Sequence, residues 1–520
     1  MEVSVTRVLL INPVVREEDD PRHIPYGISQ LAALADQAGH LVQILDANAW
    51  RPDDNDLKAV LQADDWDVIG VGGITTTYGY TKKIMRYAKQ YSPHSLRVLG
   101  GGILTSIPQD MMRLIPEVDL GVVGEGFVTF SEILEKIAVG DLDFSKTLGV
   151  IYRDQAGNGK LTPPRPLIPD LDVLPYPAWD VLPMDIYLRN SSLIYSEEAF
   201  SAKKRMDVNG SFGCPFICRF CFHLGLAGDL QYQDPNNPAA DVVFTYNREN
   251  RVHSPKYIVQ MVKHMRDKYG ADFVIFFDEN LLAMNAATHN TWLPEVCRLW
   301  IEAGLQPQCV RDGVPHDPEH CHGVHWGGTS HAAHANSEIL RLMHGAGCSQ
   351  LVYGYESFSK RVLKNVGKGS TPETNKRSLH LTMEAGIRPI PNQIMGFPDD
   401  WFDSLIDCVE AWEELGIEVK PFFATPYPGS EWFNKYKDRI LAQYGESENP
   451  LDAFLMDLGD ATKVTAVICE NFNAVELLGL RELMVARDIK RIREYQKVWE
   501  EAHGQPTFSN VRWAGAARRK

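Results

Sequence analysis

The sequence predicts an α/β protein with two parallel sheets: a doubly wound sheet near the N-terminus and a barrel of the TIM type, or part of one, in the middle of the chain, followed by helices. Short apolar runs alternate with segments of helical periodicity over the first 150 residues and again from about residue 205 to 430. Strands that are apolar along their whole length are buried on both faces, as in parallel sheets. From about residue 431 the pattern is helical and charged.

Composition divides the chain in the same way. Residues 152–189 are rich in proline and aspartate, with prolines concentrated at 163–166 and 174–177, which is typical of an extended linker. We therefore predict four parts: an N-terminal domain at 1–150, a linker at 151–195, the barrel at 196–430 and a mainly helical C-terminal domain at 431–520.

The first domain is predicted to contain five strands, at 5–12, 41–45, 67–72, 97–102 and 120–126. Helices are predicted between them at 27–38 and 80–91, and after the last at 129–137. Glycines cluster where the third, fourth and fifth strands end: Gly72, Gly73, Gly100, Gly101, Gly102, Gly124 and Gly126. Ligands bind at the carboxyl ends of such strands, and glycine lets the backbone approach them closely. We expect a ligand crevice there; the alternative is that these glycines only form tight turns.

The barrel is predicted from strands at 273–277, 350–355, 391–397 and 419–424, with helices at 255–268, 337–344 and 372–385. Polar side chains follow two of these strands: Asp278, Glu279 and Asn280, and then Glu356 and Ser357. Barrels of this kind carry their chemistry at the carboxyl ends of the strands.

The charge balance excludes some partners. The 520 residues include 52 lysines and arginines against 68 aspartates and glutamates, a net charge of −16, whereas a nucleic-acid partner requires a basic surface. No apolar run is long enough to predict a membrane span. The nine cysteines are odd in number and none precedes Cys214, unlike a secreted disulfide framework. Since residues 1–12 do not have the pattern of a signal peptide, we expect a reducing, cytoplasmic compartment.

Cys214, Cys218 and Cys221 place three thiols within eight residues. Thiolates are the ligands of iron–sulfur clusters. Three of them around a 4Fe–4S cluster leave one iron open to the amino and carboxylate groups of a substrate. The alternative is a zinc loop with His223 as the fourth ligand; zinc sites more often use paired Cys-x-x-Cys motifs, and no second one is present.

The spacing Cys-x3-Cys-x-aromatic-Cys, with Phe220 as the aromatic residue, resembles the signature of the radical S-adenosylmethionine enzymes. The resemblance implies a partial (βα)6 barrel of the TIM type. It also implies that the three cysteines hold the cluster and that S-adenosylmethionine binds its open iron. An external one-electron reductant of the flavodoxin or ferredoxin type would then release a 5′-deoxyadenosyl radical. By the same resemblance, we expect these residues to lie near S-adenosylmethionine: Phe220, Asp278, Glu279, Asn280, Glu356 and Ser357.

Three further motifs resemble the cobalamin-dependent branch of this family: 354–357 (Gly-Tyr-Glu-Ser), 396–398 (Gly-Phe-Pro) and 426–430 (Pro-Tyr-Pro-Gly-Ser). The first 150 residues resemble that branch's Rossmann-like cobalamin-binding domain. The residues implied in cobalamin binding are Gly72, Gly73, Thr75, Thr76, Thr77, Tyr78, Gly100, Gly101, Gly102, Gly124, Glu125 and Gly126. The chain has no Asp-x-His-x-x-Gly motif, and Ile103 and Leu104 follow Gly102. We therefore expect the loop 75–78, rather than a histidine, to face the cobalt; a domain that has lost cobalamin is the alternative.

The resemblance favours a radical methyltransferase that acts on an unactivated carbon, which base catalysis cannot reach. Its substrate would be a small molecule or a protein side chain, such as a glutamine of methyl-coenzyme M reductase. The alternatives are a cyclase or oxygenating enzyme acting on a tetrapyrrole or another small molecule, and a non-catalytic cobalamin-binding sensor. A methylthiolation enzyme is disfavoured, because that group carries additional cysteines in its N-terminal domain.

A second metal site is predicted in the segment 309–334. Six of the sixteen histidines lie between 316 and 334. Cysteine and imidazole bind zinc or iron(II), and the predicted ligands are Cys309, His316, His320 and Cys321. The alternatives are a surface loop with incidental histidines, or histidines that hold a polar substrate. We expect the segment to be an insertion near the barrel mouth, with 326–328 turning the chain towards the next barrel element.

Overall fold

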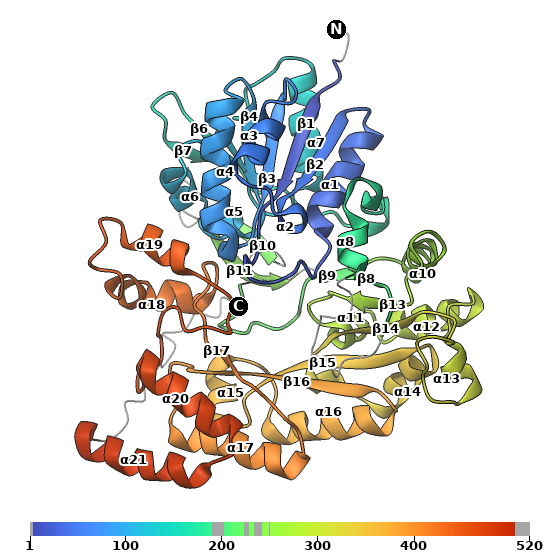
Figure 1. Ribbon diagram of the computed structural model, residues 1–520, viewed down its shortest axis with the longest axis vertical. Helices are drawn as coiled ribbons and strands as arrows, with labels where there is room; N and C mark the ends of the chain where they lie inside the picture. Colours follow the sequence, from blue (N-terminus) through green and yellow to red (C-terminus); the bar gives the residue numbers. More distant parts are fainter. Residues whose placement is uncertain (1–3, 190–201, 223–227, 233–241, 249, 505–520) are drawn as a thin grey trace, which may run out of the picture.

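The computed structural model describes residues 4–189, 202–222, 228–232, 242–248 and 250–504. Figure 1 shows two parallel-sheet domains stacked on each other, with the C-terminal helices along one side. The predicted α/β architecture is confirmed.

The N-terminal sheet has seven strands in the order β2-β1-β3-β4-β5-β6-β7. The first five in this order are parallel, and each corresponds to a predicted strand. They are β1 (Arg7–Asn12), β2 (Leu41–Asp46), β3 (Val68–Gly72), β4 (Leu96–Gly100) and β5 (Leu120–Val122). The helices are α1 (Tyr26–Gln37), α2 (Ala47–Trp50), α3 (Asp54–Leu61), η1 (Thr75–Thr77), α4 (Tyr78–Tyr91), α5 (Gly102–Ser106), α6 (Pro108–Leu114) and α7 (Phe127–Ala138).

The N-terminal domain extends further than predicted. An antiparallel hairpin, β6 (Val150–Arg153) and β7 (Gly159–Leu161), adds two strands at the edge next to β5. These residues fall in the predicted linker, because their short strands are surrounded by proline, glycine and aspartate. The remaining connection contains η2 (Leu171–Val173), η3 (Trp179–Val181) and α8 (Met184–Arg189).

The second sheet is the predicted partial barrel, six parallel strands in the order β17-β16-β15-β14-β13-β8. They are β8 (Arg205–Val208), β13 (Phe273–Phe276), β14 (His325–Ser330), β15 (Cys348–Glu356), β16 (Arg388–Met395) and β17 (Phe422–Phe423). Strands β8 and β14 were not expected, since β8 carries Arg205 and Asp207 and β14 begins at a histidine. The expected turn at 326–328 is wrong: these residues lie inside β14, where Gly327 packs directly against Gln350 of β15.

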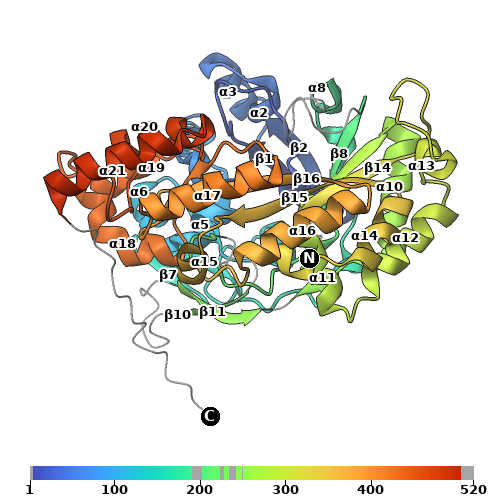
Figure 2. The same ribbon diagram turned by 90° about the horizontal axis from the view of Figure 1, so that it is seen from below.

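Helices cover the outer face of this sheet, with α14 (Ser337–Gly345), α16 (Pro372–Glu384) and α17 (Phe402–Leu415) lying along β15 and β16 (Figure 2). The helices are α10 (Pro255–His264), η5 (Met265–Tyr269), α11 (Leu281–Ala287), α12 (Trp292–Glu302), α13 (Gln308–Asp312), η6 (Ala332–His334), α14 (Ser337–Gly345), α15 (Lys360–Val366), α16 (Pro372–Glu384) and α17 (Phe402–Leu415). Two small antiparallel pairs accompany the barrel: β9 (Ser211–Phe212) with β12 (Arg251–Val252), and β10 (Gly228–Tyr232) with β11 (Val242–Arg248).

The C-terminal helices divide between the two domains instead of building a core of their own. They are α18 (Glu431–Ala442), α19 (Pro450–Asp457), α20 (Ala474–Val485) and α21 (Ile489–His503). Helices α20 and α21 pack on α17, where the Trp499 ring lies 4.9 Å from that of Trp401. Helix α19 packs on α4 of the N-terminal domain, and its Phe454 belongs to the same apolar core as Ile84. In the described part of the chain, no helix has the length and apolar character of a bilayer span.

Asp452 provides a test of whether the packing of α19 on α4 stabilises the N-terminal domain. Its carboxylate accepts hydrogen bonds from the buried Tyr78 hydroxyl and, at 2.6 Å, from Lys82 Nζ, both on α4. Asp452→Ala leaves the Tyr78 hydroxyl without its partner, which costs about 1–3 kcal/mol. We expect a Tm several degrees lower in calorimetry. Asp438→Ala, at an exposed position of α18, is the control. An unchanged Tm for Asp452→Ala would show that the contact of α19 with α4 does not stabilise the domain.

The same contact predicts a pH dependence. Burial alone would raise the pKa of Asp452, but Lys82 and Tyr78 outweigh it and hold the pKa below its ordinary value. The stabilisation is therefore present above the ordinary carboxyl pKa and is lost as the pH falls through the lower folded-state pKa. Asp452→Asn should remove this part of the acid sensitivity.

Candidate functional site

The cysteine loop follows β8 and β9, so it lies at the carboxyl end of the barrel strands. Cys218 is buried, whereas Cys214 and Cys221 are half-buried. The Arg219 N–H donates to the carbonyl of Val366 at 3.0 Å, and its carbonyl accepts from Trp432 N at 3.3 Å. The loop is thus held between the end of α15 and the start of α18. His223, the alternative zinc ligand, lies outside the described residues.

Lys368 is a site residue that sequence reasoning missed. Its ammonium donates to Glu356 Oε1 at 2.7 Å, and both side chains are buried. Burial lowers the pKa of Lys368, but the Glu356 carboxylate and the thiols of Cys218 and Cys214 outweigh it and raise the pKa above its ordinary value. Lys368 is therefore a fixed positive charge beside the thiols.

The same surroundings shift the pKa values of the thiols. Burial raises the pKa of Cys218 to about 11, while Lys368 acts in the opposite direction. Burial also raises the pKa of Cys214. Thiolates are costly in this buried loop unless a cation is near, and metal ions together with Lys368 would stabilise them.

Glu356 is held in an uncommon backbone conformation, with φ of 61° at the end of β15. A non-glycine residue in this region costs about 1–3 kcal/mol and persists only where its surroundings enforce it. Gly354 makes the arrangement sterically feasible, because a Cβ there would overlap the Glu356 carboxylate and lie 2.9 Å from Lys368 Nζ. The predicted Gly-x-Glu pattern is explained by this packing.

A second layer supports the loop from the side of β14. The Phe216 ring stacks on His331, with centroids 3.8 Å apart. His331 Nε2 lies 2.7 Å from the Lys368 carbonyl, and the His331 N–H donates to Asn280 Oδ1 at 3.1 Å. Asn280, predicted near S-adenosylmethionine, thus caps α11 and positions His331.

Aromatic side chains close the opposite side of the loop. The Phe220 ring lies 6.2 Å from Phe397 and 6.0 Å from Trp432, and Lys368 Nζ lies 5.8 Å from its centre. The Phe222 ring lies 5.5 Å from Tyr427. The motifs at 396–398 and 426–430 therefore contact the cysteine loop.

Two residues predicted near S-adenosylmethionine are engaged elsewhere. The Asp278 carboxylate accepts from Gly210 N at 2.9 Å and from the Ser211 hydroxyl, which fixes the start of the cysteine loop to β13. Burial raises the pKa of Asp278 to about 7. The Ser357 hydroxyl accepts from Ser359 N at 3.0 Å and lies 3.4 Å from Cys408 Sγ on α17. Both side chains thus position the backbone, while Glu279 lies half-buried beside Asp278.

The barrel end also has polar atoms that the protein leaves unsatisfied. In the described part of the chain, the buried atoms Ser330 Oγ, Ser370 Oγ and Gln393 Nε2 have no hydrogen-bond partner in the protein. Ser330 ends β14, Ser370 follows Lys368 and Gln393 pairs with Glu356 across the sheet. Such groups are stable when a polar ligand satisfies them. The residues present therefore fit a polar cofactor such as S-adenosylmethionine beside the cysteine loop.

The glycine-rich edge of the N-terminal sheet fits a large ligand. Gly101 has φ of 86°, and a Cβ there would overlap the backbone of Gly73, so β3 and β4 end in direct contact. At Gly72 and Gly102 an added Cβ would meet no atom within 4 Å, which leaves open space above the strand ends. Gly100, Gly124 and Gly126 are half-buried along the same edge. An open backbone surface of this kind fits the corrin of cobalamin.

The loop 75–78 was expected to face the cobalt, but most of its side chains are buried in the protein. Thr75, Thr77 and Tyr78 are buried; the Thr77 hydroxyl donates to the Ile74 carbonyl at 2.8 Å, and Tyr78 is bound to Asp452. Thr76 is half-buried, while Ile74, which sequence reasoning missed, is 43% exposed. Ile74 and Thr76 are therefore the side chains of this loop available to a ligand.

Glu125 is also engaged differently from the prediction. Its carboxylate pairs with Arg251 at 3.0 Å and accepts from Ile168 N at 3.2 Å. Arg251 belongs to β12, so the Glu125 side chain joins the N-terminal domain to the barrel. The signal for this was absent from the sequence, because the two residues are far apart in the chain.

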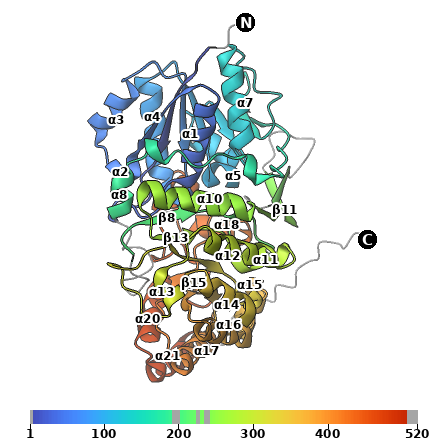
Figure 3. The same cartoon turned by 90° about the vertical axis from the view of Figure 1, so that its right-hand side faces the viewer.

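The two ligand-binding edges face each other. Gly429, in the motif after β17, packs against Ser106 of α5, with an added Cβ only 2.7 Å from Ser106 Oγ. The Ile24 N–H donates to Asp207 of β8 at 2.8 Å. Figure 3 shows the domains stacked with α2 and α5 at their junction. The glycine-rich edge thus opens towards the end of the barrel that carries the cysteine loop.

The predicted second metal set is only partly brought together. Cys309, His316 and Cys321 converge, but the fourth member of the group is His325. His320 is corrected: its side chain is 84% exposed and lies 2.7 Å from Asp317. The group lies where β14 begins, at the amino ends of the barrel strands, and not near the mouth as expected. Burial raises the pKa of Cys309 to about 12 and lowers that of His325 to about 3.

Known proteins share both domains. A model of the B12 binding domain matches residues 13–134, and a model of the radical SAM superfamily matches residues 208–411. An uncharacterised methyltransferase of Pyrococcus horikoshii is 26% identical over 435 residues, covering 82% of each chain. The anaerobic magnesium-protoporphyrin IX monomethyl ester cyclase of Rubrivivax gelatinosus is 24% identical over 380 residues, covering 72% of this chain and 59% of the relative.

The fold is also that of a solved structure. The radical S-adenosylmethionine methyltransferase TsrM from Kitasatospora setae, with cobalamin and an iron–sulfur cluster bound, superimposes with a TM-score of 0.62 over 99% of this chain and 94% of its own, at 16% identity. The chain thus belongs to the B12-binding radical S-adenosylmethionine enzymes, whose cofactors are a 4Fe–4S cluster, S-adenosylmethionine and cobalamin.

Proposed function

We propose that the enzyme transfers a methyl group to a carbon of its substrate that carries no acidic proton. The observation that carries the proposal is the opposition of the two edges, joined where Gly429 packs against Ser106. A substrate between them would meet both cofactors at once. The relatives named methyltransferases in Pyrococcus horikoshii and Kitasatospora setae support the methyl outcome.

Bound at these edges, S-adenosylmethionine supplies the radical that abstracts hydrogen and cobalamin supplies the methyl group. The chain's own residues would bind the cofactors, orient the substrate and exclude water. Cys214, Cys218 and Cys221 would hold the cluster, and Lys368 would balance its negative charge. The rings of Phe397 and Trp432 are buried beside Phe220 and keep water from that side of the cluster.

We also propose that electrons enter from an external flavodoxin- or ferredoxin-type donor at the exposed side of the cysteine loop. Ile217, between Cys214 and Cys218, is 44% exposed. Only the cysteine loop would then separate the docked donor from the cluster.

Cyclisation is the second candidate function, favoured by the relative named a magnesium-protoporphyrin ester cyclase. It requires the same radical and the same opposed edges but no net methyl transfer. The comparisons give no support to a glutamine of methyl-coenzyme M reductase as the substrate, and it is not carried into the proposal.

Labelled S-adenosylmethionine separates the two functions. Reconstituted enzyme is incubated with reductant, S-adenosylmethionine carrying a deuterated methyl group, and an extract of cells that lack the gene. Methyl transfer predicts label on the extracted cobalamin and in a product that requires the enzyme, measured by mass spectrometry. An enzyme-dependent product that forms without label, with unlabelled cobalamin, would support cyclisation instead.

The cluster assignment is tested with a triple variant. Replacing Cys214, Cys218 and Cys221 by alanine should remove the four cluster irons and abolish 5′-deoxyadenosine formation, because the thiolates bind the iron. Cys297→Ala, which removes a buried thiol of α12, is the matched control and should keep both. Unchanged iron content in the triple variant would contradict the assignment.

Lys368 is predicted to act through the charge of the cluster. Lys368→Met should lower the cluster's reduction potential, because reduction adds negative charge that the ammonium no longer balances. We expect at least a tenfold slower formation of 5′-deoxyadenosine. Lys364→Met removes an exposed lysine charge from α15 and serves as the control.

Loss of stability must be separated from this effect. Lys368→Met leaves Glu356 buried without its partner, which costs about 3–5 kcal/mol. The double variant Lys368→Met with Glu356→Gln removes the unpaired charge and should recover Tm. A reduction potential in both variants equal to that of the native enzyme would rule out the electrostatic role.

A further inference from the structure

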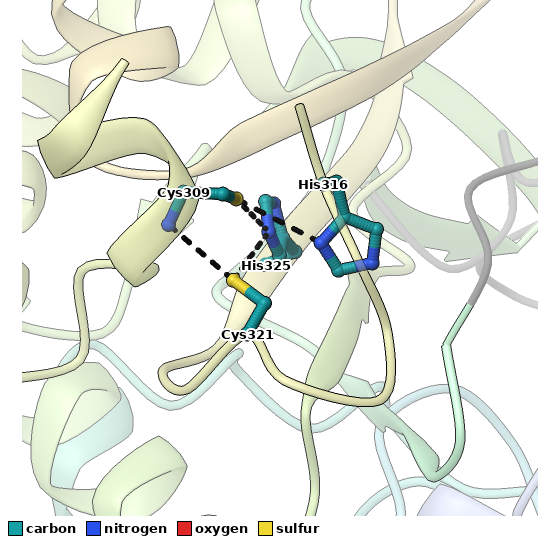
Figure 4. A group of neighbouring side chains, drawn as sticks. All are labelled: Cys309, His316, Cys321 and His325. Atoms are coloured by element: carbon teal, nitrogen blue, oxygen red, sulfur yellow. Dashed lines mark hydrogen bonds between the residues drawn. The ribbon is translucent and has the colours of Figure 1, made fainter. Parts of the chain in front are cut away.

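The cysteine–histidine group at the amino end of β14 lies apart from the site described above. Its members are Cys309 of α13, His316 and Cys321 of the following loop, and His325 at the start of the strand (Figure 4). All barrel strands are parallel, so the cluster cysteines lie at the other end of the sheet. The five steps from His325 to Ser330, the first and last residues of β14, span about 16 Å at 3.3 Å per residue.

The four ligand atoms are spaced as a tetrahedral ion requires. They lie within 4.8 Å of one another. Cys309 Sγ lies 3.3 Å from His325 Nε2 and 3.7 Å from His316 Nδ1, and Cys321 Sγ lies 4.0 Å from His325 Nε2. A tetrahedral zinc with bonds of about 2.3 Å to sulfur and about 2.0 Å to nitrogen separates its ligands by about 3.5 Å. The observed separations fall on both sides of this value, so sub-ångström shifts would complete the shell.

The loop is folded around this group by its backbone. Gln308 N donates to the His322 carbonyl at 2.7 Å, and Val324 N donates to the Leu305 carbonyl at 2.8 Å, which closes the loop at its base. Gly313 turns the chain with φ of 65° at the end of α13. The Cys309 N–H donates to Cys321 Sγ at 3.4 Å.

We propose that Cys309, His316, Cys321 and His325 bind one zinc ion that fastens the loop 313–324 to the amino end of β14. Two thiolates and two imidazoles complete a four-coordinate shell with no open position, the composition of a structural rather than a catalytic site. Cys309 and His325 are buried, while His316 and Cys321 close the shell from the surface.

A disulfide between Cys309 and Cys321 is the competing interpretation. It would use both sulfurs but would not explain why the two imidazoles point at the same centre (Figure 4). The two interpretations differ in metal content and in the oxidation state of the thiols.

Metal analysis of the full-length protein tests the proposal. The protein is produced with zinc in the medium and purified anaerobically without chelators. We expect about one zinc per chain in the native protein. Zinc should fall at least fivefold in Cys321→Ser and in His316→Gln, which replace the two less buried ligands. His320→Gln and His322→Gln change exposed histidines of the same loop and should retain zinc.

X-ray absorption at the zinc edge of the native protein gives a result that does not depend on variants, and neither cluster iron nor cobalt interferes. Two sulfurs at about 2.3 Å and two nitrogens at about 2.0 Å are expected. Less than a tenth of an equivalent of zinc in the native protein, a zinc shell without sulfur, oxidised Cys309 and Cys321, or zinc retained in both Cys321→Ser and His316→Gln would each overturn the proposal.

Discussion

Every strand of a parallel sheet ends at the same edge, and the functional part of this molecule depends on that constraint. Glycines lie at the ends of β3, β4 and β5 of the first domain, and the barrel strands end near the cysteine loop, Glu356 and the motifs after β16 and β17. The chain places one edge against the other. Glu125 with Arg251 and Asp207 with Ile24 fix the two sheets in this opposition. Residues that are far apart in the sequence thereby come together between the two facing sheet edges.

Within that region the strongest electrostatic feature is the buried pair of Lys368 and Glu356. A buried ion pair contributes little net stability, because both ions lose their hydration. Its persistence in this position, with Glu356 in a left-handed conformation, points to a role in the chemistry of the neighbouring thiols. Phe216, His331 and Asn280 hold the Lys368 backbone from the other side. The cysteine loop is thus fixed by side chains from three different barrel segments.

Local patterns predicted much of this arrangement. The spacing of Cys214, Cys218 and Cys221, the apolar strands and the glycines at their ends are each contained in a few consecutive residues. Roles that depend on a distant partner were not predictable in this way. Lys368 lies in an ordinary helix-to-loop segment, and its role depends on Glu356, twelve residues away. The side-chain partners of Tyr78 and Glu125, Asp452 of α19 and Arg251 of β12, lie far from them in the sequence. His325 was not predicted as a ligand, because the Trp326, Gly327 and Gly328 that follow it suggested a turn and not a barrel strand.

The division of the C-terminal helices has a consequence for exchanging modules between relatives. Helix α19 completes the core of the N-terminal domain, whereas α20 and α21 complete that of the barrel. Each of the two structural units is therefore built from segments that are not continuous in the sequence. A hybrid that combines the first domain of one enzyme with the barrel of another must take α19 from the first parent and α20 and α21 from the second. A simple cut between the domains would leave a foreign helix in one of the two cores.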